Sequence, residues 1–174
     1  MSERSMATAI EKSHSLKEID LSYNQITAVG AQTLASVIEK SASLQRINLG
    51  NNQITDEGAT ALAVAVEKSA SLQNLTQNRI TDEGVKALAA AIEKSASLQA
   101  IFLKCNRITD EGATALAVAI EKSASLQSID LGSNLITAVG ATALATAIEK
   151  SKSLGHHRGA IVRDLVGCEV DHLK

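Results

Sequence analysis

One repeat of about 28 residues runs through most of this chain, and it constrains the fold more than any other feature. A Ser-Leu pair recurs, with its leucine at Leu16, Leu44, Leu72, Leu98, Leu126 and Leu154. The interval is 28 residues throughout, except for 26 between Leu72 and Leu98. Asparagines and glycines keep the same period, at Asn24, Asn52, Asn78, Asn106 and Asn134, and at Gly30, Gly58, Gly84, Gly112 and Gly140. Such a period predicts a solenoid in which each unit packs on its neighbours.

Each unit carries the patterns of one strand and one helix. Ile47 and Leu49 alternate as they would in a strand, whereas Gly58, Leu62 and Val66 recur every four residues, as on one face of a helix. We expect the Thr55 hydroxyl to cap the first helical turn, with Asp56 and Glu57 at the positive end of the helix dipole. Glycine disfavours a helix interior, so Gly58 predicts a close approach of the backbone to a neighbour.

The pattern Leu-x-x-Ile-x-Leu-x-x-Asn-x-Ile, followed by Gly four residues on, resembles the leucine-rich repeat of ribonuclease inhibitor, which also occurs in NOD-like receptors. The resemblance covers residues 1–154. It implies an α/β horseshoe with a parallel β-sheet on the concave side and α-helices on the convex side. It also implies that an asparagine ladder ties the turn after each strand to the adjacent repeat; its members are Asn24, Asn52, Asn78, Asn106 and Asn134.

The repeats divide the chain into two regions. Residues 1–154 hold a half repeat at 1–13 and five units, of which the third is shortened to 26 residues. Residues 155–174 abandon the pattern, and we interpret them as a capping helix or as a disordered tail. A poorly covered end predicts weak self-association through exposed solenoid ends.

The short third unit predicts an irregular sheet. Losing two residues keeps the inward and outward alternation, but it removes one interior side chain worth roughly 1.5–3 kcal/mol of burial. We therefore expect a shortened or kinked strand, and we expect that restoring two residues after Asn74 raises the melting temperature.

Composition and charge exclude several function classes. A formal net charge of -2 lacks the basic surface that a nucleic-acid-binding protein requires. No run of roughly 18 apolar residues is present, and the N-terminal residues are polar and charged, so we expect no membrane span and a cytoplasmic protein. The two cysteines, Cys105 and Cys168, are expected to be reduced thiols.

No residue pattern indicates catalysis, and we predict neither an enzyme nor a bound cofactor. His156, His157, Cys168 and His172 fit no zinc-ligand spacing, so we expect no metal site. The paired carboxylates at Asp56-Glu57, Asp82-Glu83 and Asp110-Glu111 recur at every central helix start, where the helix dipole already explains them.

Sequence variation concentrates on the strands. Residues 55–73 and 109–127 differ only by Val66 against Ile120, so the outer helices are nearly identical. The strand positions expected to face outward differ between units and include Phe102, and aromatic and arginine side chains are frequent in binding hot spots. We predict a partner-binding concave face composed of Glu18, Asp20, Tyr23, Arg46, Asn48, Thr76, Phe102, Lys104 and Asp130.

These features favour a protein-protein interaction scaffold, whether whole or part of a larger receptor or regulator. The first alternative is a GTPase-activating protein, because a family acting on the small GTPase Ran uses similar repeats; more repeats and an acidic tail are typical of that family. The second alternative is a repeat array with no specific partner. The sequence does not name the partner, because a concave sheet is a general platform.

Overall fold

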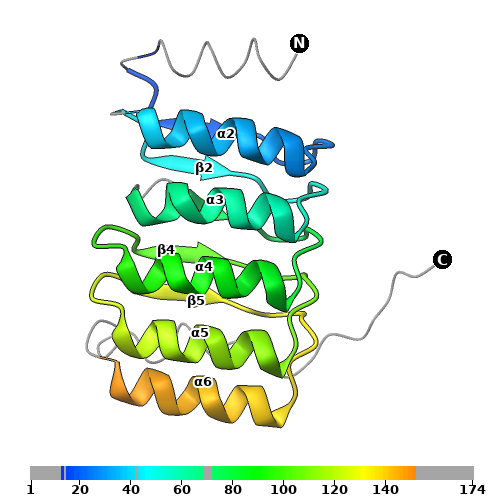
Figure 1. Ribbon diagram of the computed structural model, residues 1–174, viewed down its shortest axis with the longest axis vertical. Helices are drawn as coiled ribbons and strands as arrows, with labels where there is room; N and C mark the ends of the chain where they lie inside the picture. Colours follow the sequence, from blue (N-terminus) through cyan, green and yellow to red (C-terminus); the bar gives the residue numbers. More distant parts are fainter. Residues whose placement is uncertain (1–12, 14, 42, 69–71, 152–174) are drawn as a thin grey trace, which may run out of the picture.

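Strands and helices alternate along the chain, one of each per repeat (Figure 1). The computed structural model describes residues 13, 15–41, 43–68 and 72–151, without the side chains of 72 and 73. The strands in this part are β1 (Glu18–Asp20), β2 (Arg46–Asn48), β3 (Leu72–Asn74), β4 (Ala100–Phe102) and β5 (Ser128–Asp130). The helices are α2 (Ala28–Lys40), α3 (Asp56–Lys68), α4 (Asp82–Lys94), α5 (Asp110–Lys122) and α6 (Ala138–Lys150). The half repeat, except Ser13, and the segment 155–174 lie outside the described residues.

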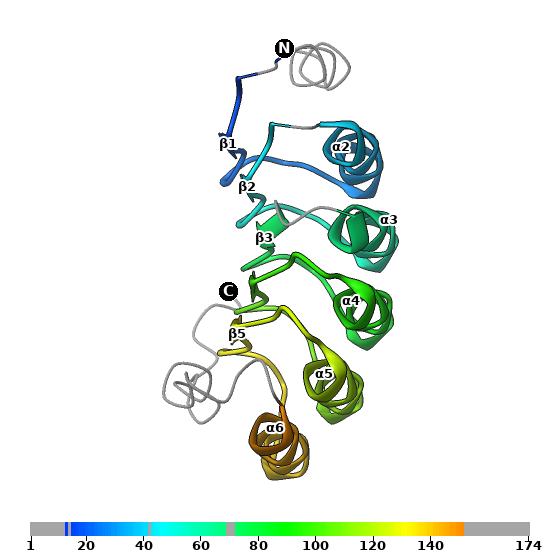
Figure 2. The ribbon, with the colours of Figure 1, turned by 90° about the vertical axis from the view of Figure 1, so that its left-hand side faces the viewer.

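The strands form one parallel sheet in chain order, β1 to β5. The helices stack in the same order along one side of this sheet (Figure 2). Parallel strands need a crossover connection, and here each connection is a 13-residue helix. The predicted leucine-rich-repeat solenoid of the α/β class is therefore confirmed. No helix in the described part of the chain is long and apolar enough to cross a membrane.

The core lies between the sheet and the helices, in one layer per repeat. The middle residues Ile47, Ile101 and Ile129 are at most 2% exposed. Each helix supplies a buried leucine at the matching position: Leu34, Leu62, Leu88, Leu116 and Leu144. Burying a side chain of this size stabilises the fold by roughly 1.5–3 kcal/mol, so repetition of the layers supplies the main driving force.

Asparagine side chains join each repeat to the one before it. Asn106 Nδ2 donates to Leu75 O of the preceding repeat at 3.0 Å and to Leu103 O of its own repeat at 2.9 Å. Its Oδ1 accepts from the backbone N–H of Ile80 at 3.1 Å. The same three contacts occur at Asn52, Asn78 and Asn134. At the first repeat, Asn24 donates to carbonyl groups of its own turn.

A second inter-repeat contact lies at the helix starts, and the sequence did not predict it. Asp82 Oδ1 accepts from the N–H groups of Thr109 at 2.8 Å and Gly112 at 3.0 Å, both in the following repeat. Its Oδ2 accepts from the Thr109 hydroxyl at 2.6 Å. Asp56 contacts Thr81 in the same way, and Asp110 contacts Thr137. Each of these carboxylates therefore caps the next helix in the stack.

The threonines play a smaller part in capping than we expected. Thr109 and Thr137 accept from their own first turns, each at 3.3 Å, whereas Thr27 and Thr81 make no such bond. The close approach expected at the helix glycines is present: a Cβ at Gly84 would lie 2.6 Å from Asp56 Oδ1. The glycine is needed because the capping carboxylate of the preceding repeat occupies that space.

The third strand is irregular, as we expected, because its register with β2 shifts between Ile47 and Asn48, but its length and the place of the missing residues differ from our expectation. β3 has three residues, like its neighbours, so it is not shortened. Leu72 pairs with Ile47 and Asn74 pairs with Asn48, so two steps along β3 face one step along β2. Asn74 also pairs with Phe102. The two missing residues therefore precede Asn74 instead of following it, because the asparagine keeps its register with both neighbours.

This register refines the insertion experiment. Inserting Ala-Ile between Gln73 and Asn74 reproduces the segment around Ala100 and Ile101, and should add one buried isoleucine worth roughly 1.5–3 kcal/mol. We expect thermal unfolding to shift upward by about 3–10 °C. An Ala-Ser insertion at the same place is the control, and an equal shift from it would contradict the explanation.

Removing a ladder asparagine should destabilise the stack strongly. Asn106→Ala leaves Leu75 O, Leu103 O and the Ile80 N–H without that partner, so we expect a loss of about 2–4 kcal/mol in the free energy of unfolding. Asn24 is exposed, and Asn24→Ala removes two bonds within its own turn that water largely replaces, so it should cost about 1 kcal/mol or less. Urea denaturation measures both values, and equal losses would argue against an inter-repeat role.

The capping carboxylates predict a pH dependence. Hydrogen bonds from the Thr137 hydroxyl, the Thr137 N–H and the Gly140 N–H lower the pKa of Asp110. Its ionised form is thus favoured in the folded state, and its stabilisation is complete above the unfolded pKa of about 3.9. We expect wild type to unfold at higher urea concentration than Asp110→Asn at pH 7. The difference should shrink below about pH 4 and vanish below the lowered folded pKa. Glu57→Gln is the control for the loss of one negative charge. A difference between wild type and Asp110→Asn that stays constant with pH would contradict this mechanism.

Candidate functional site

One row of side chains crosses the strand side of the solenoid. Strand pairing places in register the last residue of each strand: Asp20, Asn48, Asn74, Phe102 and Asp130. Their neighbours in the chain, such as Ile19, Ile47, Ile101 and Ile129, point to the core because strand residues alternate. We call these five residues the central row.

Four members of the central row are held by their own backbone. In each, Oδ1 accepts from the N–H two residues later, at 2.9 to 3.0 Å; these N–H groups belong to Ser22, Gly50, Thr76 and Gly132. Such a turn leaves a second polar atom, Nδ2 in the asparagines and Oδ2 in the aspartates, for other contacts, and the Asn48 side chain also donates to Asp20. The row therefore presents polar groups whose orientation is fixed before any partner arrives.

Charges gather at the β1 end of the sheet. Glu18 pairs with Arg46 across β1 and β2, and more than half of each side chain is exposed, so the pair adds little stability. Asp20 accepts from both the hydroxyl and the N–H of Ser22, and these bonds lower its pKa. Asp20 is consequently ionised at neutral pH.

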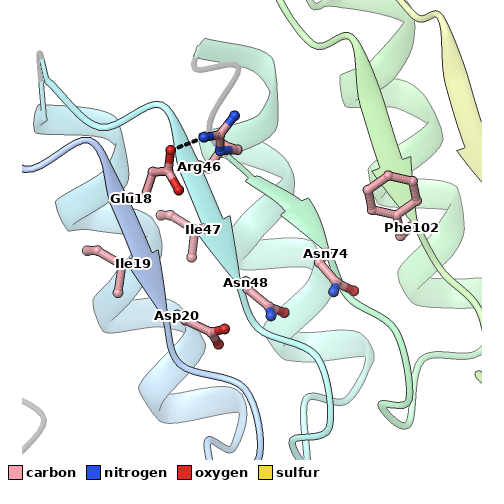
Figure 3. A pocket seen from close by; sticks show the side chains of 8 residues that line it. All are labelled: Glu18, Ile19, Asp20, Arg46, Ile47, Asn48, Asn74 and Phe102. Atoms are coloured by element: carbon pink, nitrogen blue, oxygen red, sulfur yellow. Dashed lines mark hydrogen bonds and ion pairs between the residues drawn. The ribbon is translucent and has the colours of Figure 1, made fainter.

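A shallow hollow of about 450 Å³ spans β1 to β4 on this face. Figure 3 shows Glu18 and Asp20 at one side, the Phe102 ring at the other, and Asn48 and Asn74 between them. The hollow is open and combines an acidic side, amide groups and an aromatic wall. Such a surface suits recognition of an extended segment more than enclosure of a small molecule.

The structure places the predicted site residues in three groups. Glu18, Asp20, Arg46, Asn48 and Phe102 line the hollow, and Asp130 lies beyond Phe102 on the central row. Thr76 and Lys104 follow their strands by two residues, and the Gln77 N–H donates to Lys104 O, so they lie side by side in the next row. Tyr23 is 82% exposed, in the turn after β1.

Sequence reasoning missed Asn74, which the structure places on the central row and in the hollow. Aligning the short repeat with the other repeats from its first residue does not place Asn74 on the central row. Counting back from the ladder finds it: Asn74 precedes Asn78 by four residues, as Asn48 precedes Asn52.

The turn after each strand has an unusual backbone. Tyr23, Asn51, Gln77, Cys105 and Ser133 have φ between 54° and 56°, in the left-handed region. The residue just before each ladder asparagine thus reverses the chain so that the amide can reach the turn carbonyls. Cys105 is a half-buried free thiol in this turn, directly after Lys104.

Among the residues that the structure describes, no three His, Cys, Asp or Glu side chains are grouped to hold a metal ion. His156, His157, Cys168 and His172 lie outside them. The repeated carboxylates Asp56, Asp82 and Asp110 contact threonines of the next repeat, which assigns them a structural role.

Comparisons with known proteins agree with this architecture. A family profile described as leucine-rich repeats (2 copies) matches residues 14–63, and another leucine-rich-repeat profile matches residues 68–89, 94–117 and 122–145. None of the curated protein sequences compared with the chain matches it.

Two solved structures share the fold. Actin-binding site 2 of leiomodin-1 superposes with a TM-score of 0.67 at 15% identity, over 83% of this chain and 86% of that chain. The tropomodulin C-terminal domain from Caenorhabditis elegans gives 0.66 at 18% identity, over 86% and 93%. The profile matches together cover more than half of the chain, which therefore belongs to the leucine-rich-repeat proteins.

Proposed function

We propose that this chain is a non-catalytic scaffold that binds a partner protein on the concave face of its sheet. The observation that carries the proposal is the position of Phe102. The other four members of the central row each supply an oxygen that accepts from their own backbone, whereas a phenyl ring supplies none. β4 thus forgoes a hydrogen bond worth about 1 kcal/mol and gains a half-buried aromatic surface in the hollow.

Further support comes from the contrast between the two sides of the solenoid. The helices repeat nearly the same residues, whereas the central row changes from acid to amide to aromatic. One solved structure with this fold is an actin-binding region, so the architecture is compatible with binding a protein. For this chain the partner is unidentified, and we propose a site around Glu18, Asp20, Arg46 and Phe102 that extends to Lys104 and Asp130.

Two narrower assignments accompany the proposal. We assign the repeats to the ribonuclease-inhibitor type, because 28-residue units that each hold a 13-residue helix fit that type. We assign the chain to the cytoplasm, because the Cys105 thiol is free and half-buried.

The variant Phe102→Asn tests the proposal by separating stability from binding. Asparagine provides the backbone acceptor that Asn48 and Asn74 already provide, so we expect unchanged or slightly higher thermal stability. Partner recovery in affinity purification with quantitative mass spectrometry should fall about tenfold, because an aromatic anchor is lost. Arg46→Ala should also reduce recovery of the same protein.

Val118→Ala is the matched control, because Val118 is an exposed apolar residue on the outer helix α5. A protein recovered equally by wild type and Phe102→Asn, or lost equally with Val118→Ala, would count against the concave site. A photoactivated cross-linker on Cys105, in a Cys168→Ser background, should link the same partner, since this thiol follows Lys104 directly.

A further inference from the structure

We infer that the hollow recognises a partner segment with a basic side chain that pairs with Asp20 and an apolar side chain, four residues away, that packs on Phe102. The inference rests on the proposed function and specifies the chemistry of the partner. It follows from the charge, the order and the spacing of the central row.

The first step concerns the charge of Asp20. Of the two carboxylates that line the hollow, Glu18 is already paired with Arg46. Asp20 accepts from neutral groups, the hydroxyl and N–H of Ser22 and the side chain of Asn48, and in the part of the chain that the structure describes it forms no ion pair. Its negative charge is therefore uncompensated and lies at the open side of the hollow, where a lysine or arginine can reach it.

The second step concerns the opposite wall. Phe102 lies half-buried at the far side of the hollow, and its ring offers the aromatic surface there (Figure 3). Beyond it on the central row is Asp130, but Lys104 follows Phe102 by two residues and brings a positive charge to that side. The basic side chain of the partner is therefore assigned to Asp20, and its apolar side chain to Phe102.

The third step concerns the groups between these ends. Oδ1 of Asn48 and Oδ1 of Asn74 are engaged with backbone N–H groups at 3.0 and 2.9 Å. Asn48 Nδ2 also donates to Asp20, which leaves it one N–H, and Asn74 Nδ2 can donate as well. A carbonyl oxygen of a crossing peptide is the natural acceptor for these groups. Because the asparagines are already oriented, ordering them costs little entropy on binding.

The spacing sets the sequence of the segment. Asp20 and Phe102 are three strand positions apart, which corresponds to about 14 Å at roughly 4.8 Å per strand. An extended chain advances about 3.3 Å per residue, so a segment crossing the strands reaches both residues with side chains four positions apart. The expected pattern is Arg or Lys, three residues of any type, then Leu or another apolar residue.

The test uses three synthetic peptides and the full chain. The probe is acetyl-Gly-Arg-Ser-Gly-Ser-Leu-Gly-amide, which has the predicted spacing. One control peptide has Glu in place of Arg, and the other, acetyl-Gly-Ser-Gly-Ser-Arg-Leu-Gly-amide, has the same composition with adjacent Arg and Leu. In ¹⁵N NMR titrations we expect the probe to shift the amide signals of Asp20, Asn48 and Asn74, and to bind at least about threefold more tightly than either control.

Two variants connect this binding to the assigned residues. Asp20→Asn removes the charge but keeps the turn, as Asn48 and Asn74 demonstrate in this chain. It should lower the affinity for the probe peptide about three- to tenfold. Phe102→Ala should weaken it about tenfold. Glu57→Gln, a charge change at an exposed position in the first turn of α3, should leave the affinity unchanged.

The inference is wrong if the glutamate peptide binds as tightly as the probe, if no peptide shifts the hollow signals, or if Asp20→Asn has no effect. The proposed function is judged separately, by recovery of a cellular partner with Phe102→Asn. A partner that depends on Phe102 but not on Asp20 would support the scaffold and overturn the charge assignment.

Discussion

The structure depends on hydrogen bonds that each repeat cannot satisfy alone. The turns after β1 to β4 expose carbonyl groups, and the segment leading to the next helix exposes an N–H; the asparagine of the following repeat binds both. These atoms are mostly buried, with Asn52, Asn78 and Asn106 only 7–8% exposed, so water does not replace a lost partner. A repeat is therefore complete only when its neighbour is present, and the solenoid gains its order from this dependence.

Ion pairs play a lesser part, although they repeat with the same period. The lysine at the end of a helix pairs with a glutamate of the preceding helix at Lys68–Glu39, Lys94–Glu67, Lys122–Glu93 and Lys150–Glu121. All of these side chains are at least one-third exposed, and such pairs contribute about 0–1 kcal/mol each. Buried layers, asparagines and capping aspartates therefore hold the stack together. The outer face of the sheet is left free to vary without loss of the fold.

Periodicity predicted the fold from the sequence because each layer uses the same residues for the same purpose. It predicted the solenoid, the sheet and helix sides, and five of the residues that line the hollow. It did not predict that Asp82 caps the helix of the next repeat, because an acidic first turn is equally well explained by the dipole of its own helix. It misplaced Asn74, because a repeat with two missing residues aligns with its neighbours from either end, and only strand pairing decides between them.

Phe102 illustrates how a repeat protein acquires a specific surface. At the equivalent position the other described strands have Asp or Asn, whose oxygen binds the backbone two residues later. Local stability favours that choice at every strand by about 1 kcal/mol, a small fraction of the total. The inter-repeat contacts of Asn106 remain in the same repeat, so β4 keeps its place in the stack without the local bond. Strong coupling between repeats thus permits a locally unfavourable residue on the sheet surface, and a surface that departs from the repeat is the one able to distinguish partners.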